Sequence, residues 1–157
     1  MNTRNLEMAS EIQIRPKQNL QDKIHTIRGF QVMLDSDLAE LYGVEAKRLN
    51  EQVKRNTERF PQSFRFQLTE DEYENLRSQF ATSSSKKSLN LQVSSLEHGG
   101  RRYLPYVFTE QGISMLSAVL RSEIAIKVSI QIIEAFVNMR KFISNNALIF
   151  QRLDALE

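Results

Sequence analysis

The chain has 157 residues, of which 41% are hydrophobic and 25% charged, an ordinary composition for a soluble globular protein with one sizeable core. It contains no cysteine, which excludes disulfides, thiolate metal sites and cysteine nucleophiles and leads us to expect a cytoplasmic location. The formal net charge of +2 does not by itself indicate a nucleic-acid partner, and no apolar run reaches the roughly 18 residues of a membrane span, so no membrane partner is expected.

Residues 1–19 show little pattern, and we interpret them as a flexible N-terminal arm. Two β-rich runs follow at residues 24–27 and 30–34, separated by Arg28-Gly29. A two-residue turn that contains glycine is typical of a β-hairpin. Alternation along the second run predicts that one face of it is buried.

The stretch over residues 34–56 has the pattern of two helices joined by a tight turn. Asp35 or Ser36 can cap the first helix, because either side chain can accept a hydrogen bond from the backbone. Gly43 is expected to end that helix, since glycine takes the left-handed conformation that a side chain resists. The pattern therefore indicates a helix-turn-helix.

The second of these helices, over residues 45–56, carries Leu49 and Val53 four positions apart, which mark its buried face. Its other faces are basic and polar. Arg and Lys can contact guanine edges or phosphates, and Asn and Gln can contact adenine. Helical hairpins without such a function show the same spacing, so these residues alone leave both interpretations open. We predict that the DNA contacts come from Arg48 and Asn50 on base edges and from Lys47, Lys54 and Arg55 on phosphates.

The next segment combines a strand pattern with a helix start. Residues 64–68 alternate between apolar and polar, which predicts a strand after Pro61. Thr69, with Glu72 three residues on, forms a capping box that opens a short helix to about residues 76–78. The acidic residues here would suit a metal site, but the electrostatics of a helix start explains them better.

Residues 81–102 are polar and low in complexity, and we interpret them as a long β-loop. Residues 86–102 hold four basic residues and one acidic residue, a local balance of +3. Such a loop is typical of a DNA-binding wing, and a solvated surface loop explains it equally well. We predict that phosphates are contacted by the four basic residues, Lys86, Lys87, Arg101 and Arg102.

A strand is predicted over residues 103–108, with Pro105 indicating an edge or a bulge. Thr109 is expected to cap a helix over residues 110–120, in which Gly112 permits close backbone packing. Ser122 then caps a long helix, which we predict to be a core helix. Its stripe is formed by Ile126, Ile130, Ile133 and Val137 and widened by Ile132 and Phe136.

From residue 132 onward the apolar positions alternate by three and four, which is a heptad pattern. Asn146 falls at an a position, where asparagine fixes the register of a two-stranded parallel coil. A single helix packed on its own domain would also explain the stripe, because Phe136, Ile143 and Phe150 widen it beyond a simple seam. We predict a homodimer through Met139, Phe142, Asn146, Ile149, Leu153 and Leu156.

Several motifs in this order carry a family resemblance. They are VMLD at 32–35, DLAELYGV at 37–44, KRLNEQVKRN at 47–56, RFP at 59–61, FQLT at 66–69, YLP at 103–105 and FTEQG at 108–112. Over about residues 24–142 the chain resembles the phage and bacterial DNA-binding module called the ORF-six N-terminal domain, related to KilA-N and to phage antirepressors. The resemblance implies an α+β DNA-binding fold and a role in phage or mobile-element gene control. Together with the elements predicted above, we expect an α+β fold with a helix-turn-helix, small β-hairpins or a wing, and a long C-terminal helix.

We therefore expect an arm at 1–19, a KilA-N-like DNA-binding domain at 20–142 and, at 143–157, a C-terminal helix that starts a coiled coil. The leading hypothesis is a regulator that binds double-stranded DNA. The alternative is an antirepressor-type module that binds another regulator protein. No enzyme and no cofactor are expected, because the acidic residues lie at helix starts, the two histidines are far apart, and no Walker-type glycine loop is present.

Overall fold

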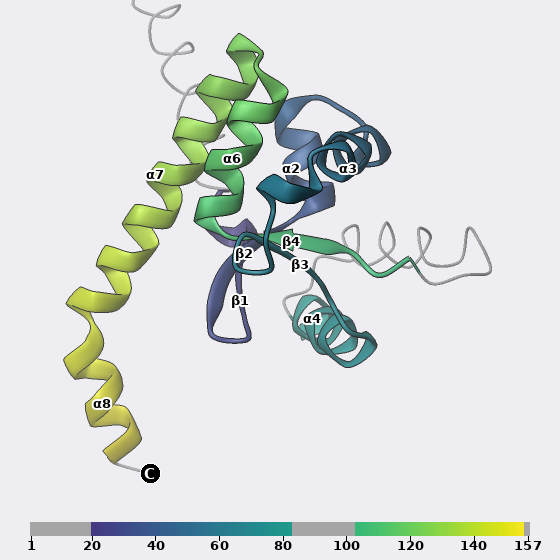
Figure 1. Cartoon of the computed structure of the whole chain (residues 1–157). Coiled ribbons are helices and arrows are strands. Elements are labelled where there is room, and N and C mark those ends of the chain that lie inside the picture. The colour runs from purple at the N-terminus through teal and green to yellow at the C-terminus, as the bar shows by residue number, and fades with distance from the viewer. Residues whose placement is uncertain (1–19, 83–102, 156–157) are drawn as a thin grey trace, which may run out of the picture.

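The computed structural model describes residues 20–82 and 103–155 (Figure 1). The predicted N-terminal arm, the basic loop with Lys86, Lys87, Arg101 and Arg102, and Leu156 lie outside these residues. The described part combines helices with an antiparallel sheet of four strands, which confirms the predicted α+β class and its long C-terminal helix.

The described residues form helices and strands in the following chain order. They are η1 (Gln21–Lys23), β1 (Ile24–Ile27), β2 (Phe30–Leu34), α2 (Asp35–Tyr42), α3 (Ala46–Arg55), η2 (Thr57–Arg59), β3 (Arg65–Gln67), α4 (Glu70–Thr82), β4 (Tyr106–Phe108), α6 (Glu110–Leu120), α7 (Glu123–Asn145) and α8 (Ala147–Ala155).

The sheet has the strand order β1-β2-β4-β3, with every neighbouring pair antiparallel. The predicted hairpin is confirmed: Ile27 pairs with Phe30, and Arg28 and Gly29 both have positive φ in the turn. The prediction for residues 103–108 was wrong in part. β4 begins only after Pro105 and is an interior strand, and the Pro105 carbonyl accepts a hydrogen bond from the Leu68 N–H at 3.0 Å.

Both faces of the sheet are covered, whereas the sequence pattern predicted one buried face. Val32 and Leu34 pack toward α4, and Met33 on the opposite face packs toward α2, α6 and α7. Figure 1 shows α4 on one side of the strands and α2, α3 and α6 on the other side. Consecutive buried residues in β2 are what a sheet between two layers requires.

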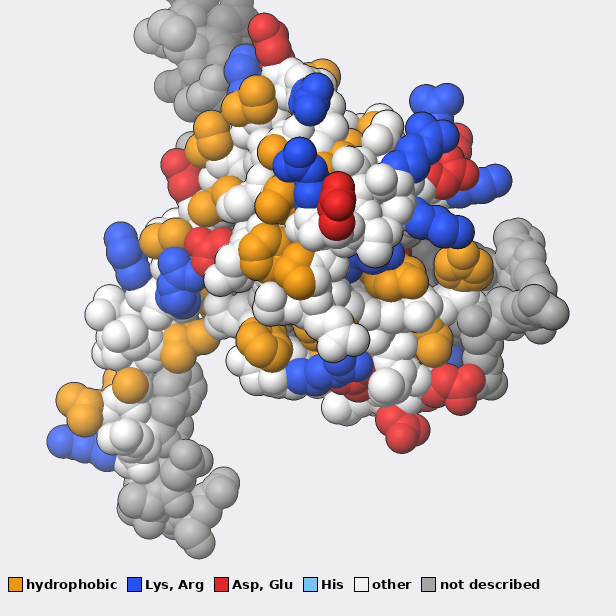
Figure 2. Space-filling view, in the orientation of Figure 1, with side chains coloured by type: hydrophobic (Ala, Val, Ile, Leu, Met, Phe, Trp, Pro, Cys, Tyr) orange, Lys and Arg blue, Asp and Glu red, His pale blue; other side chains and the backbone are white. Residues whose placement is uncertain are grey.

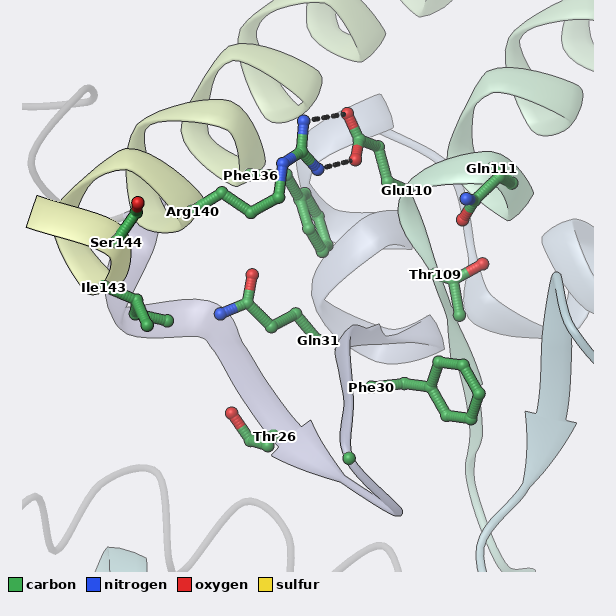
Figure 3. A pocket seen from close by; sticks show the side chains of 11 residues that line it. Thr26, Phe30, Gln31, Thr109, Glu110, Gln111, Phe136, Arg140, Ile143 and Ser144 are labelled. Atoms are coloured by element: carbon green, nitrogen blue, oxygen red, sulfur yellow. Dashed lines mark hydrogen bonds and ion pairs between the residues drawn. The ribbon is translucent and has the colours of Figure 1, made fainter. Parts of the chain in front are cut away.

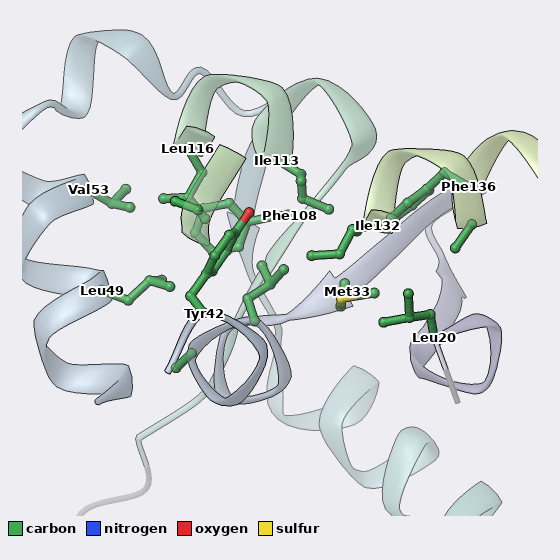
Figure 4. Packing of buried hydrophobic residues seen from close by; sticks show 14 of the residues in the cluster. Leu20, Met33, Tyr42, Leu49, Val53, Phe108, Ile113, Leu116, Ile132 and Phe136 are labelled. Carbon is green, nitrogen blue, oxygen red and sulfur yellow. The ribbon is translucent and has the colours of Figure 1, made fainter. Parts of the chain in front are cut away.

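The larger core joins α3 to the rest of the domain (Figure 4). Leu49 and Val53 are fully buried, as predicted, and they meet Tyr42, Ile113 and Leu116 from α2 and α6. Each fully buried aliphatic side chain stabilises the folded state by about 1.5–3 kcal/mol relative to the same side chain exposed to water. The α2–α3 hairpin is therefore a rigid part of the domain.

Several predicted helix ends are confirmed. Gly43 takes the left-handed conformation after α2, with φ 72°. At α4, the Thr69 N–H donates to Glu72 at 2.8 Å and the Glu72 N–H donates to Thr69 Oγ1 at 3.2 Å, which completes the capping box. Thr109 and Ser122 accept hydrogen bonds from the first turns of α6 and α7.

The buried face of α7 differs from the predicted stripe. Ile126 and Ile130 are 48% and 52% exposed. Ile132 and Phe136, predicted only to widen the stripe, are instead buried with Ala125 and Ser129. The small residues let α7 approach its neighbours, and Ser129 Oγ lies 2.7 Å from the Tyr42 hydroxyl in a buried hydrogen bond. No helix in the described ranges is long and apolar enough to span a membrane.

Candidate nucleic-acid interface

Helix α3 lies at the surface of the domain and packs on it mainly through one face. A tight turn after Gly43 leads into it, closed by hydrogen bonds from the Gly43 N–H to the Glu40 carbonyl at 3.1 Å and from the Val44 N–H to the Ala39 carbonyl at 2.9 Å. Leu49 and Val53 fix the inner face. Apart from the half-buried Asn50, the polar and charged side chains of α3 are exposed to solvent.

Four basic side chains occupy the outer faces of α3, which we call the α3 basic face: Lys47, Arg48, Lys54 and Arg55. All four are exposed, and among the described residues none has an ion-pair partner. Figure 2 shows Lys and Arg side chains gathered where Figure 1 places α3. With Glu51 as its one acidic residue, α3 has a net charge of +3, larger than that of the whole chain.

The spacing divides these residues into two rows. Positions seven apart lie almost above one another on an α-helix, because seven residues make nearly two turns. Arg48 and Arg55 therefore form one row, and Lys47 and Lys54 form the next. The exposed Gln52 lies four residues after Arg48 and three before Arg55, so it belongs beside the arginine row.

Asn50 does not share this outer surface, contrary to prediction. Its Nδ2 donates to Asp35 Oδ2 at 2.9 Å, and its Oδ1 is buried without a hydrogen-bond partner in the described structure. Position 50 lies one residue beyond Leu49, on the side of α3 that turns toward the start of α2. The sequence assigned Asn50 to the surface because polarity alone does not reveal a buried partner.

Asp35 receives that hydrogen bond and two others. Its carboxylate accepts from the Ser36 N–H at 2.8 Å, from Asn50, and from the Tyr106 N–H at 3.3 Å. The predicted capping role of Asp35 or Ser36 is wrong, because α2 begins at Asp35 and its N-cap is Leu34, without a side-chain hydrogen bond. Burial raises the pKa of Asp35, and the hydrogen bonds from Asn50 and the backbone oppose that rise. The carboxylate thus joins α2, α3 and β4.

Arg65 on β3 is a cationic group beside this contact, and its place in the sequence does not predict it. Its guanidinium lies 3.7 Å from the centre of the Tyr106 ring, and it is half-buried. Burial lowers the pKa of Arg65, and its attraction to Tyr106 and Asp35 opposes that shift. In the sequence it is only the polar position of an alternating strand, so no local signal distinguished it.

We expect Asn50→Ala to lower the free energy of unfolding by about 1–3 kcal/mol, since the buried Asp35 carboxylate would lose a donor. Urea unfolding measures this loss. Gln52→Ala is the matched control, because it truncates an exposed amide two residues away on the same helix. Equal stability of the two variants would show that the Asn50–Asp35 contact does not hold α3 in place.

A hollow of about 510 Å³ lies on another side of the domain, between the β1–β2 hairpin, the start of α6 and the second half of α7 (Figure 3). Arg140 and Glu110 form a bidentate ion pair across it, with Gln31 and Phe136 also facing the space. None of the predicted DNA-binding residues lines it. In the described parts of the chain, no three Asp, Glu or His side chains are grouped as metal ligands would be.

Comparison with known proteins identifies the family. A family model described as the ORF6N domain matches residues 22–119, which is more than half of the chain. The match runs from η1 to α6 and includes α2 and α3. Helix α7 lies beyond it, so the match is shorter than the predicted resemblance over residues 24–142. No curated protein and no solved structure matches the chain. The chain belongs to the ORF6N domain family.

Proposed function

We propose that this protein is a regulator of phage or mobile-element type that binds double-stranded DNA, with α2 and α3 acting as a helix-turn-helix and α3 lying in the major groove. The observation that carries the proposal is the α3 basic face, whose four cations have no ion-pair partner among the described residues. Cations of this kind can contact DNA phosphates without first losing an internal ion pair. As part of this proposal we place its function in the cytoplasm.

The two rows of α3 suit different tasks. The row of Arg48 and Arg55, with Gln52 beside it, offers the groups that pair with guanine and adenine edges. The row of Lys47 and Lys54 offers point charges for phosphates. This assignment replaces Asn50 with Gln52 as the amide that reaches a base, because Asn50 is bonded to Asp35.

The test begins with a binding site selected from a random pool of duplex DNA. Arg48→Ala should weaken binding to that site by about 5- to 100-fold and relax the preference at one base pair, the effect of losing one base-reading contact. Lys54→Ala should instead weaken all sequences alike and reduce the slope of log affinity against log salt by about one. Fluorescence anisotropy at several salt concentrations measures both.

Lys127→Ala provides the charge-matched control, because Lys127 is an exposed lysine on a different helix, α7. It should bind the selected site within about twofold of wild type, since an exposed charge that does not contact the DNA is largely screened by salt. If Arg48→Ala and Lys127→Ala bind equally well, α3 does not read the DNA.

The alternative is an antirepressor-type module that acts by binding another regulator protein. The exposed Ile126 and Ile130 on α7 favour it, because neighbouring exposed aliphatic residues are typical of protein interaction sites. In that case we expect the wild type to show no salt-dependent binding to duplex DNA. Ile126→Glu, rather than Arg48→Ala, would then weaken capture of the regulator.

A further inference from the structure

The end of α7 and the whole of α8 extend away from the domain (Figure 1). Phe142, Ile143 and Ile149 on this extension are 58%, 43% and 56% exposed. Isolated helices shorter than about 12–15 residues are marginal in water, and α8 has nine residues. A helix this short, carrying exposed aliphatic residues away from its own core, requires another surface to stabilise it.

The residues at the heptad positions are buried in the first part of the pattern and leave the core further along the chain. Ile132 and Ala135, the first two positions of the predicted pattern, are buried against the protein's own domain. The following positions leave that core and form what we call the distal seam: Met139, Phe142, Asn146 and Ile149. The explanation by packing on the protein's own domain thus accounts for Ile132 and Ala135, and it does not account for the spacing over the end of α7 and α8. The same spacing continues at Leu153 and Leu156, whose side chains lie outside the described structure.

The charges around the distal seam suit an identical partner. In this heptad the flanking positions are Asn138, Ile143 and Asn145, all uncharged, so two copies would not bring like charges together. Arg140 and Lys141 fall at positions outside the seam and its flanks. Arg140 is also paired with Glu110 in its own domain.

Asn146 indicates how two copies would align. It is the C-cap of α7, with φ −106° and ψ 9°, and its N–H and its Nδ2 both donate to the Phe142 carbonyl, at 3.1 and 2.8 Å, which closes the last turn of α7 before α8. A polar side chain in an apolar seam is costly unless it meets a polar partner. In a parallel, in-register pair, Asn146 meets the Asn146 of the second copy.

We propose that a second copy of this chain packs on the distal seam to form a parallel homodimer. The two domains then lie at the same end of the helix pair, with both α3 helices available to the same DNA molecule. The dimer does not depend on the proposed DNA binding, and its test contains no DNA.

The test compares two double variants of the full-length chain by sedimentation equilibrium at up to about 100 µM, a range in which weak dimers are populated. Phe142→Glu with Ile149→Glu places charges in the distal seam. Ile126→Glu with Ile130→Glu is the matched control, since it places the same charges on another exposed apolar face of α7. We expect dimers for the wild type and the control, and a dimer at least about 100-fold weaker for the seam variant.

A monomeric wild type at the highest concentration overturns the proposal. So does a seam variant that stays as dimeric as the wild type, or a control variant that dissociates. Circular dichroism and melting confirm that each variant is folded, which is expected because all four substituted residues are exposed.

The orientation has its own test, because the chain contains no cysteine. In a parallel, in-register pair, the two residues 149 face each other. The Cα atoms of Ile149→Cys should then be separated by about 4.4–6.8 Å, the usual range for a disulfide. Mild oxidation should therefore cross-link this variant. A dimer of Ile149→Cys that does not cross-link overturns the parallel arrangement.

Discussion

Replacing Gly112 with alanine is expected to destabilise the domain by about 3 kcal/mol or more, at the upper end of the cost of overpacking a core. A Cβ at this position would lie less than 3.0 Å from the carbonyl oxygen of Phe64. That carbonyl cannot move aside easily, because it accepts hydrogen bonds from the Thr109 N–H at 3.0 Å and from Thr109 Oγ1 at 3.2 Å. The close contact therefore lies where β3, β4 and the start of α6 meet, and relieving it would disturb all three.

The measurement is thermal and urea unfolding, and a loss of this size lowers Tm by about 10 °C. Gly43→Ala is the matched control. Its added Cβ would meet nothing within 4 Å, but the left-handed φ of 72° costs a side chain about 1–2 kcal/mol. If Gly112→Ala is no less stable than Gly43→Ala, the contact with Phe64 does not limit the packing of α6.

The features that the sequence predicted correctly are those decided within a few residues. The turn at Arg28-Gly29, the capping box of Thr69 and Glu72, and the caps at Thr109 and Ser122 depend on side chains next to the backbone groups that they satisfy. Gly112 belongs with them, since its place in the first turn of a helix already indicated close packing. The ordered motifs also sufficed to predict the family.

The features that the sequence missed are decided by contacts between distant segments. The Asn50–Asp35 hydrogen bond joins residues fifteen apart, and only the packing of α3 on α2 brings them together. On α7 the sequence offered two apolar faces. Its pattern predicts that the more hydrophobic face, with Ile126 and Ile130, is buried, whereas the face that is buried contains the small residue Ser129. Hydrophobicity alone favours the face with the two isoleucines. The face of α7 that is buried is the one whose small residues allow α7 to pack closely on α2.

Asp37→Asn is expected to stabilise the protein at neutral pH by about 1–3 kcal/mol, from about 1.36 kcal/mol for each unit of pKa change. Burial, with smaller contributions from the nearby carboxylates of Glu40 and Asp35, raises the pKa of Asp37 to about 6, and Lys23 opposes the rise. In the unfolded chain the carboxyl has its ordinary pKa of 3.8. Near neutral pH the folded state therefore holds a carboxylate that would be more stable in water.

The sign of the pH dependence follows from this difference. Between about pH 4 and pH 6 the folded protein holds the Asp37 proton more tightly than the unfolded chain, so the contribution of Asp37 to stability falls as pH rises. The advantage of Asp37→Asn should thus be largest above about pH 6 and disappear below about pH 4. Urea unfolding of both proteins across this range measures it.

Glu72→Gln serves as a control of opposite sign. Hydrogen bonds from Arg28 Nε at 2.7 Å and Nη2 at 2.9 Å lower the pKa of Glu72 to about 2. The contribution of Glu72 to stability is therefore present above its ordinary pKa of 4.5 and is lost as pH falls toward 2. Because water reaches this pair, Glu72→Gln should cost only about 1 kcal/mol at neutral pH. A difference between Asp37→Asn and wild type that stays constant from about pH 4 to 8 would show that Asp37 titrates alike in both states.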